Sequence, residues 1–309
     1  MAETGPSDRV AREMFLLTLG GDTRDLGWAL NRTVASLRDV FVGPGEPVYS
    51  QGDPAEEHYF LVSGEVKLTR PGAKDWIMGE RSVIGSLDML HERSRTRTAT
   101  ATVATHLLAM RSEDWWGLLE DRFELSNRVV LNLSAAIHAL RLRPSPLGGF
   151  DETASPGGPP AGKTAGVGQR GPLNLIARTL LLRTVPIFAR GSIQTLTALS
   201  EVASEVRASD GQLLFPRGAL GRQLAVVVEG QVTASRDPAA PSHSFGPGAL
   251  VVGTATIARG ADYEVHASGA TRVLAIPTDD YYDAMEDHFS LARSALVALA
   301  EERESLMDR

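Results

Sequence analysis

Short apolar runs separated by glycines dominate residues 37–110. Runs such as Tyr59-Phe60-Leu61-Val62 and Val66-Lys67-Leu68 have the length of β-strands, and residues 98–103 alternate between threonine and small apolar side chains. The glycines recur at short intervals: Gly43, Gly45, Gly52, Gly64 and Gly72. Many short strands joined by glycine turns predict an antiparallel β sandwich or barrel.

The hydrophobic pattern changes to a helical one after residue 111. Ser112 is a predicted N-cap, and Glu113 and Asp114 follow where the helix dipole favours anions. Between residues 126 and 142 the apolar side chains fall on one helical face: Val129, Val130, Leu133, Ile137 and Leu140. A β domain that ends in two helices is therefore predicted.

The whole pattern occurs twice, and one constant offset in residue number relates the two copies. The segment 61–66 (LVSGEV) matches 227–232 (VVEGQV), and the same offset matches 105–110 (THLLAM) with 271–276 (TRVLAI). Two aromatic pairs, Trp115-Trp116 and Tyr281-Tyr282, also correspond. Because the repeat is far longer than the roughly 20–50 residues of a solenoid unit, a whole domain is duplicated.

A segment rich in proline and glycine separates the copies. Residues 143–172 contain eight Gly and six Pro, a composition that cannot bury enough apolar surface to offset its ordering entropy. The predicted organisation is a first domain at 1–142, a linker at 143–172 and a second, degenerate domain at 173–309.

The linker contains a match to the phosphate-loop pattern G-x-x-x-x-G-K-[ST]. Gly157, Gly162, Lys163 and Thr164 fit the spacing. That loop needs a preceding strand and a following helix, and neither is predicted here. We interpret the match as chance, and an ATPase that uses Lys163 is the weakest of the functional hypotheses.

The glycine framework resembles a known family. Gly45, Val48, Gly52 and Asp53, followed by Tyr59-Phe60-Leu61-Val62 and Gly64, look like the opening of a cyclic-nucleotide-binding domain, as in the catabolite activator protein and the regulatory subunits of the cyclic-AMP-dependent kinase. The resemblance covers nearly all of both halves. It implies a mainly β fold with flanking helices, built as two tandem β jelly rolls of the cyclic-nucleotide-binding type.

The resemblance also implies a phosphate-binding cassette, F-G-E-L-A-L followed by R-x-A. In the first copy it falls on residues 84–90, where Gly85, Ser86 and Leu87 form the cradle, and on Arg97 with Thr98. In such a cassette amides face the cyclic phosphate and the arginine pairs with it. Ser86 replaces the glutamate that binds the ribose, a loss of about tenfold to a hundredfold in affinity.

Charged residues next to this cassette change the expected electrostatics. Asp88 stands where the family has a small neutral residue, and it would repel a phosphate if it faces inward. Arg93 and Arg95 add positive charge that could compensate.

The second cassette lacks both polar partners of a nucleotide. It falls on residues 252–257, and the common offset places Tyr263 opposite Arg97. Arg259 lies four residues early, in a glycine-flanked turn. We therefore expect the second copy to bind no cyclic nucleotide and to serve as a structural or partner-binding jelly roll.

Composition excludes several other classes of protein. The 309 residues include no cysteine, which excludes disulfides and thiolate metal sites, and no apolar run reaches the ~20 residues that span a bilayer. The net charge of −7 weighs against DNA binding, as does the short charged segment 301–309 where the activator family carries a DNA-reading domain. A cytoplasmic protein without membrane or DNA contacts is expected.

We expect no catalytic or metal site. The chain has no G-x-S-x-G nucleophile elbow, and no two histidines have H-x-H or H-x-x-x-H spacing. Most of the histidines are expected on the surface or on edge strands. They are His58, His91, His106, His138, His243, His266 and His288.

Two functional hypotheses remain open. In the first, a non-enzymatic regulatory protein senses cAMP, cGMP or a related phosphorylated ligand through its first domain and signals to a protein partner, without any other cofactor. In the second, both domains have lost the ligand and form a protein-binding scaffold. The apolar helix faces could pack on their own barrels or pair between chains, so a homo-oligomer also remains open.

Overall fold

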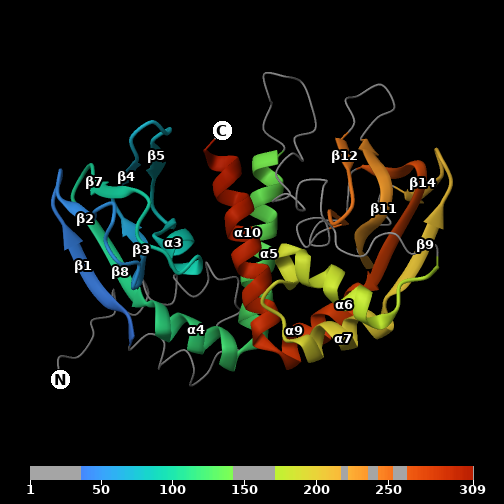
Figure 1. Cartoon of the computed structure of the whole chain (residues 1–309). Helices are drawn as coiled ribbons and strands as arrows, with labels where there is room; N and C mark the ends of the chain where they lie inside the picture. Colours follow the sequence, from blue (N-terminus) through green and yellow to red (C-terminus); the bar gives the residue numbers. More distant parts are fainter. Residues whose placement is uncertain (1–35, 142–170, 217–221, 236–242, 253–262, 309) are drawn as a thin grey trace. The chain divides into compact units, whose positions relative to one another are not determined.

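The computed structural model describes residues 36–141, 171–216, 222–235, 243–252 and 263–308 (Figure 1). The chain forms two compact units, Met1–Val129 with Asp308–Arg309, and Val130–Met307. The division falls inside a helix, earlier than the predicted domain boundary at residue 142. The predicted linker lies outside the described residues up to residue 170.

Two four-stranded antiparallel sheets build the first unit. One has the strand order β1-β8-β3-β6 and the other β2-β7-β4-β5. The strands are β1 (Arg38–Val42), β2 (Pro47–Tyr49), β3 (Glu57–Ser63), β4 (Val66–Thr69), β5 (Trp76–Met78), β6 (Val83–Ile84), β7 (Thr98–Ala101) and β8 (Thr105–Arg111).

Three helices follow or interrupt these strands: α3 (Ser86–Leu90), α4 (Ser112–Asp121) and α5 (Phe123–Arg141). The predicted cap at Ser112 is wrong by one position, because Arg111 occupies the N-cap and makes no side-chain cap bond. The amide of Ser112 instead donates to the carbonyl of Glu56 at 2.7 Å. A backbone bond to the start of β3 thus fixes the entry into α4.

The second unit repeats this plan with fewer, longer strands. Its sheet has the order β10-β14-β11-β12, with β13 on β11 and β9 on β14. The elements are α6 (Leu175–Thr184), η1 (Pro186–Phe188), α7 (Ile193–Val202), β9 (Ser204–Ala208), β10 (Leu213–Phe215), β11 (Gln223–Ser235), β12 (His243–Phe245), β13 (Leu250–Val252), β14 (Glu264–Pro277), α9 (Thr278–Asp287) and α10 (Phe289–Met307).

The constant offset between the copies holds at the level of single hydrogen bonds. The amide of Gly45 donates to Ala101 O at 2.8 Å, and that of Gly211 donates to Ala267 O at 2.9 Å. The bond from Ser112 to Glu56 likewise recurs between Thr278 N and Arg222 O, at 3.0 Å. The two copies therefore share one fold, and the predicted class, mainly β with flanking helices, is confirmed.

One glycine in each copy is required by a close backbone approach. A Cβ on Gly64 would lie 2.8 Å from Thr105 Cα, and one on Gly230 would lie 2.8 Å from Thr271 Cα. Both glycines also have a positive φ, 102° and 79°. No other residue fits this crossing, because the obstructing atoms belong to the backbone of the neighbouring strand.

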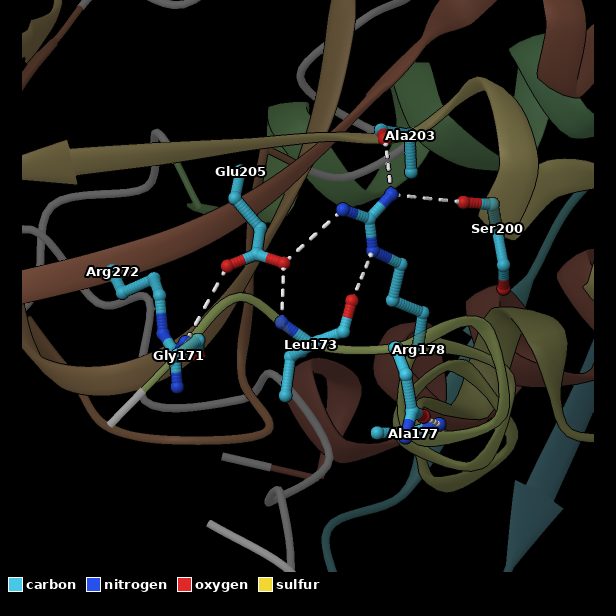
Figure 2. A network of polar contacts seen from close by, with 9 residues as sticks. Gly171, Leu173, Ala177, Arg178, Ser200, Ala203, Glu205 and Arg272 are labelled. Atoms are coloured by element: carbon cyan, nitrogen blue, oxygen red, sulfur yellow. Dashed lines mark hydrogen bonds and ion pairs between the residues drawn. The ribbon is translucent and has the colours of Figure 1, made fainter. Parts of the chain in front are cut away.

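An acid–base pair at corresponding positions joins the first strand of each copy to its last. Figure 2 shows Glu205 of β9 between Arg178 and Arg272, at 3.1 and 3.4 Å. Glu205 Oε1 also accepts the amide of Leu173 at 2.7 Å, so the network fixes the segment that leads into α6. In the first copy the same two positions hold Asp39 and His106, 2.8 Å apart.

Candidate functional site

The predicted cassette begins at a glycine in the left-handed conformation. Gly85 caps α3 with φ 77°, and a Cβ there would lie 2.5 Å from Nη1 of Arg95. The Gly85 carbonyl accepts a hydrogen bond from that same Nη1 at 2.7 Å. Ser86 and Leu87, the first two residues of α3, are half-buried. Gly85 is therefore needed both for the turn and for the space that Arg95 fills.

Asp88 faces inward, but cations and donors of its own loop already surround it. Its side chain is buried, and Oδ1 accepts from Arg93 Nε and Thr96 Oγ1, both at 2.9 Å. Oδ2 accepts the Thr96 amide at 3.2 Å. Arg93 thus supplies the positive charge that was expected to compensate for Asp88. Asp88 in turn stabilises the loop between α3 and β7.

Arg95 has a structural role that the sequence did not reveal. It is 3% exposed, donates to the carbonyls of Gly85 and Glu57, and stacks on the ring of Tyr49 at 4.3 Å. Burial raises the pKa of Tyr49, while the positive charge of Arg95 partly opposes that shift. Arg95 therefore ties the cassette to β3 and does not act as a free cation for a ligand.

Arg97 is a buried cation placed between an aromatic ring and a carboxylate. Its side chain is 2% exposed, and its guanidinium carbon lies 3.8 Å from the centre of the Trp76 ring. Nη1 donates to Lys74 O at 2.8 Å. Nη2 pairs at 2.5 Å with Oδ1 of Asp308, which belongs to the same compact unit. This arrangement can hold an oxyanion, because a charge-assisted donor is fixed in a site shielded from water.

The other predicted residue on β7 has a different partner. Thr98 Oγ1 accepts the amide of Gln51 at 3.0 Å and so holds the loop after β2. Sequence reasoning also missed Trp76 and Asp308 as partners of Arg97. No pattern indicates them, since Asp308 is 211 residues away in the chain.

The corresponding position in the second copy belongs to the hydrophobic core. Tyr263 is 3% exposed, lies among Phe245, Val251 and Val265, and donates its hydroxyl to Val251 O at 3.2 Å. Residues 253–262, which include most of the second cassette and Arg259, lie outside the described residues. An arginine that could pair with a phosphate is thus replaced by a phenol that completes the core.

His58 departs from the expectation that most histidines lie near the surface. It is 2% exposed on β3, with Nδ1 3.2 Å from Met89 Sδ and its ring 5.1 Å from that of Trp115. Burial, together with the charge of Arg95, lowers the pKa of His58 to about 3. This histidine is consequently neutral and part of the core under α3.

A cavity of about 540 Å³ opens elsewhere in the first unit, where β2, β3 and the start of α4 meet. Its lining includes Tyr49, Glu56, Arg95 and Glu113, and it includes none of the five predicted ligand residues. Within the described part of the chain, no group of three acidic or histidine side chains could hold a metal ion. None of the described helices is long and apolar enough to cross a membrane.

Comparison with known proteins finds similarity in the first copy. The family model for the cyclic nucleotide-binding domain matches residues 39–122. The chain is 35% identical over 108 residues to the Cyclic AMP receptor protein of Thermus thermophilus, covering 33% of this chain and 48% of the relative. It is 32% identical over 96 residues to the Neuropathy target esterase sws of Drosophila melanogaster, covering 29% of this chain and 7% of that protein.

Among solved structures, the regulatory domain of Toxoplasma gondii PKA with cAMP is similar over 93% of this chain and 97% of that one, with 16% identity and a TM-score of 0.33. The chain spans about half the length of the Thermus relative and a small part of the esterase. The matched residues include the cassette, Arg97 and Trp76, and the common offset carries the same architecture into the second unit. The first copy therefore resembles the cyclic nucleotide-binding domain over residues 39–122, and the second unit repeats the arrangement of strands and helices found in the first.

Proposed function

We propose that the first copy senses a cyclic nucleotide, cAMP or cGMP, or a related phosphorylated ligand, and that the chain passes this signal to a protein partner without catalysing a reaction. The observation that carries the proposal is the state of Arg97. Its guanidinium is buried, stacked on Trp76 and paired with an oxyanion. The phosphodiester of a cyclic nucleotide carries one negative charge and oxygen acceptors, as that carboxylate does.

The rest of the cassette supports weak binding. Gly85 keeps the turn that begins α3, but Ser86 offers a single hydroxyl where the family has a carboxylate. Losing a hydrogen bond to a charged group weakens binding by about tenfold to a hundredfold. The binding assay should therefore cover nucleotide concentrations from micromolar to millimolar.

Titration calorimetry on the full chain tests the proposal. We expect cAMP or cGMP to bind with one site per chain, because Tyr263 replaces the arginine in the second copy. Arg97→Ala should weaken binding by at least about tenfold. The control, Arg207→Ala, removes an exposed arginine of β9 and should leave affinity unchanged. No heat at millimolar nucleotide, or equal binding by Arg97→Ala, contradicts the sensor.

A second candidate, a ligand-free scaffold that binds a protein, is favoured by a different observation. Asp88 is fully engaged by Arg93 and Thr96, and Arg97 already has a partner within the chain. A thermal-shift screen separates the two candidates, since a ligand that binds the native state raises the melting temperature. In both cases we propose a protein partner and a cytoplasmic setting. We propose no DNA partner, because the net charge of −7 opposes binding to DNA.

A further inference from the structure

One carboxylate connects two arginines at the proposed site. Oδ1 of Asp308 lies 2.5 Å from Arg97 Nη2, and Oδ2 lies 2.6 Å from Arg70 Nη2. Each oxygen therefore has its own guanidinium. The Asp308 side chain is 25% exposed, while that of Arg97 is 2% exposed, so the carboxylate covers the cation from the solvent side.

The burial of Arg97 explains why it needs an anion. Among the described residues, its remaining polar contact is one backbone carbonyl, that of Lys74, and its Nε has no hydrogen-bond partner there. A neutral carbonyl and an aromatic face do not balance a full charge removed from water. A carboxylate at this position supplies that balance when no ligand does.

Neither partner of this pair is repeated by the duplication. Tyr263 takes the place of Arg97 in the second copy, and the position in the first copy that corresponds to Asp308 holds Leu142 in the sequence. The acid and the arginine that it meets thus each occur in only one of the two copies.

We propose that Asp308 is an internal ligand of the anion site, so that a phosphate or cyclic phosphate binds Arg97 only by displacing this carboxylate. The inference rests on the proposed function, because it concerns the regulation of the same site. The segment that carries Asp308 would then stay bound to Arg97 when no phosphate occupies the site, and it would be released when phosphate binds. The released segment is a signal that a protein partner can read.

A double-mutant cycle tests the contact without any ligand. Urea unfolding of the full chain is followed for Arg97→Gln, Asp308→Asn and the double variant. We expect a coupling of about tenfold in the unfolding constant, as for groups in direct contact. The control pairs Arg97→Gln with Asp287→Asn, an exposed acid at the end of α9, and should be additive. Additivity of the Asp308 cycle overturns the inference.

Competition is tested by titrating inorganic phosphate, cAMP and cGMP into the wild-type chain and into Asp308→Asn. If the carboxylate holds Arg97 nine-tenths of the time, the variant binds about tenfold more tightly. Asp287→Asn should match the wild type, which excludes a general effect of charge. Equal affinity of Asp308→Asn and wild type for an anion that binds overturns the inference. If none of the three anions binds either protein, the proposed sensor fails, and the cycle alone decides whether Asp308 pairs with Arg97.

Discussion

The two copies share helix bounds and backbone hydrogen bonds, and they differ in chemistry at corresponding positions. Helices α4 and α9 begin and end at corresponding residues, as do α5 and α10. Yet Arg97 corresponds to Tyr263, and the pair Asp39–His106 corresponds to Glu205–Arg272. Glycines and backbone bonds are what the fold requires. The residues that differ are free to vary, and they form part of the candidate site or an acid–base pair.

The largest effect is expected at the strand crossing that both copies share. Gly64→Ala and Gly230→Ala each place a methyl group against the backbone of the next strand, at a positive φ. We expect a loss of roughly 3–5 kcal/mol in the free energy of unfolding of the affected copy. Gly45→Ala and Gly211→Ala, at similar φ but with open space around the Cβ, should lose only about 1–2 kcal/mol. Chemical denaturation measures all four, and a large difference between Gly64→Ala and Gly230→Ala contradicts a common structural requirement.

A smaller but clear difference is expected between the acid–base pairs. Glu205→Gln leaves Arg272, 5% exposed, without its buried partner, so the second copy should lose about 3 kcal/mol. Asp39→Asn acts on side chains that are 29% and 20% exposed, and it should lose less than about 1 kcal/mol. Equal losses in urea unfolding would show that burial does not distinguish these pairs.

Acid should destabilise the first copy through His58. Its folded pKa, about 3, lies below the usual 6.5, so between these values the unfolded chain takes up the proton first. Stability from this residue is full above pH 6.5 and falls by about 1.4 kcal/mol for each pH unit below it. His58→Leu, which introduces the residue that the second copy carries at this position, should remove that part of the slope. An unchanged slope between pH 6.5 and 5 in stability measurements contradicts a neutral, buried His58.

A small effect is expected at the phenol that replaces the arginine. Tyr263→Phe deletes one hydroxyl that donates to Val251 O inside a packed core. We expect a loss of about 1 kcal/mol and a fold that is otherwise unchanged. Thermal unfolding measures the loss. A loss above about 3 kcal/mol would indicate that Tyr263 has a role beyond closing the core.

The duplicated fold could be predicted because its determinants are local and repeated. Gly64, Gly230 and the alternating strands are visible as patterns, and the constant offset extends them over both halves. The cassette could be located from Gly85 and Arg97 through the family resemblance. The predicted cap at Ser112 failed by one residue, since the backbone bond from Ser112 to Glu56 depends on tertiary structure.

The partners within the site could not be predicted. Arg95 was expected to add charge beside a ligand, but it donates to two carbonyls and stacks on Tyr49. Nothing in their spacing distinguishes Arg93 and Arg97, which bind carboxylates, from Arg95, which binds carbonyls. That choice depends on which side chains the neighbouring strands bring close, and Asp308 comes from the far end of the chain.

The length of strands β11 and β14 has a consequence for cooperativity. In the second unit they belong to a single six-stranded sheet, whereas the corresponding residues of the first unit are divided between two sheets. Their ladder runs from the pair Gln223–Pro277 to the pair Ser235–Glu264, with register shifts between Val227 and Gln231, so both ends belong to one sheet. Hydrogen exchange should consequently show the second unit opening as a single foldon, while the sheets of the first unit exchange with two separate protection levels.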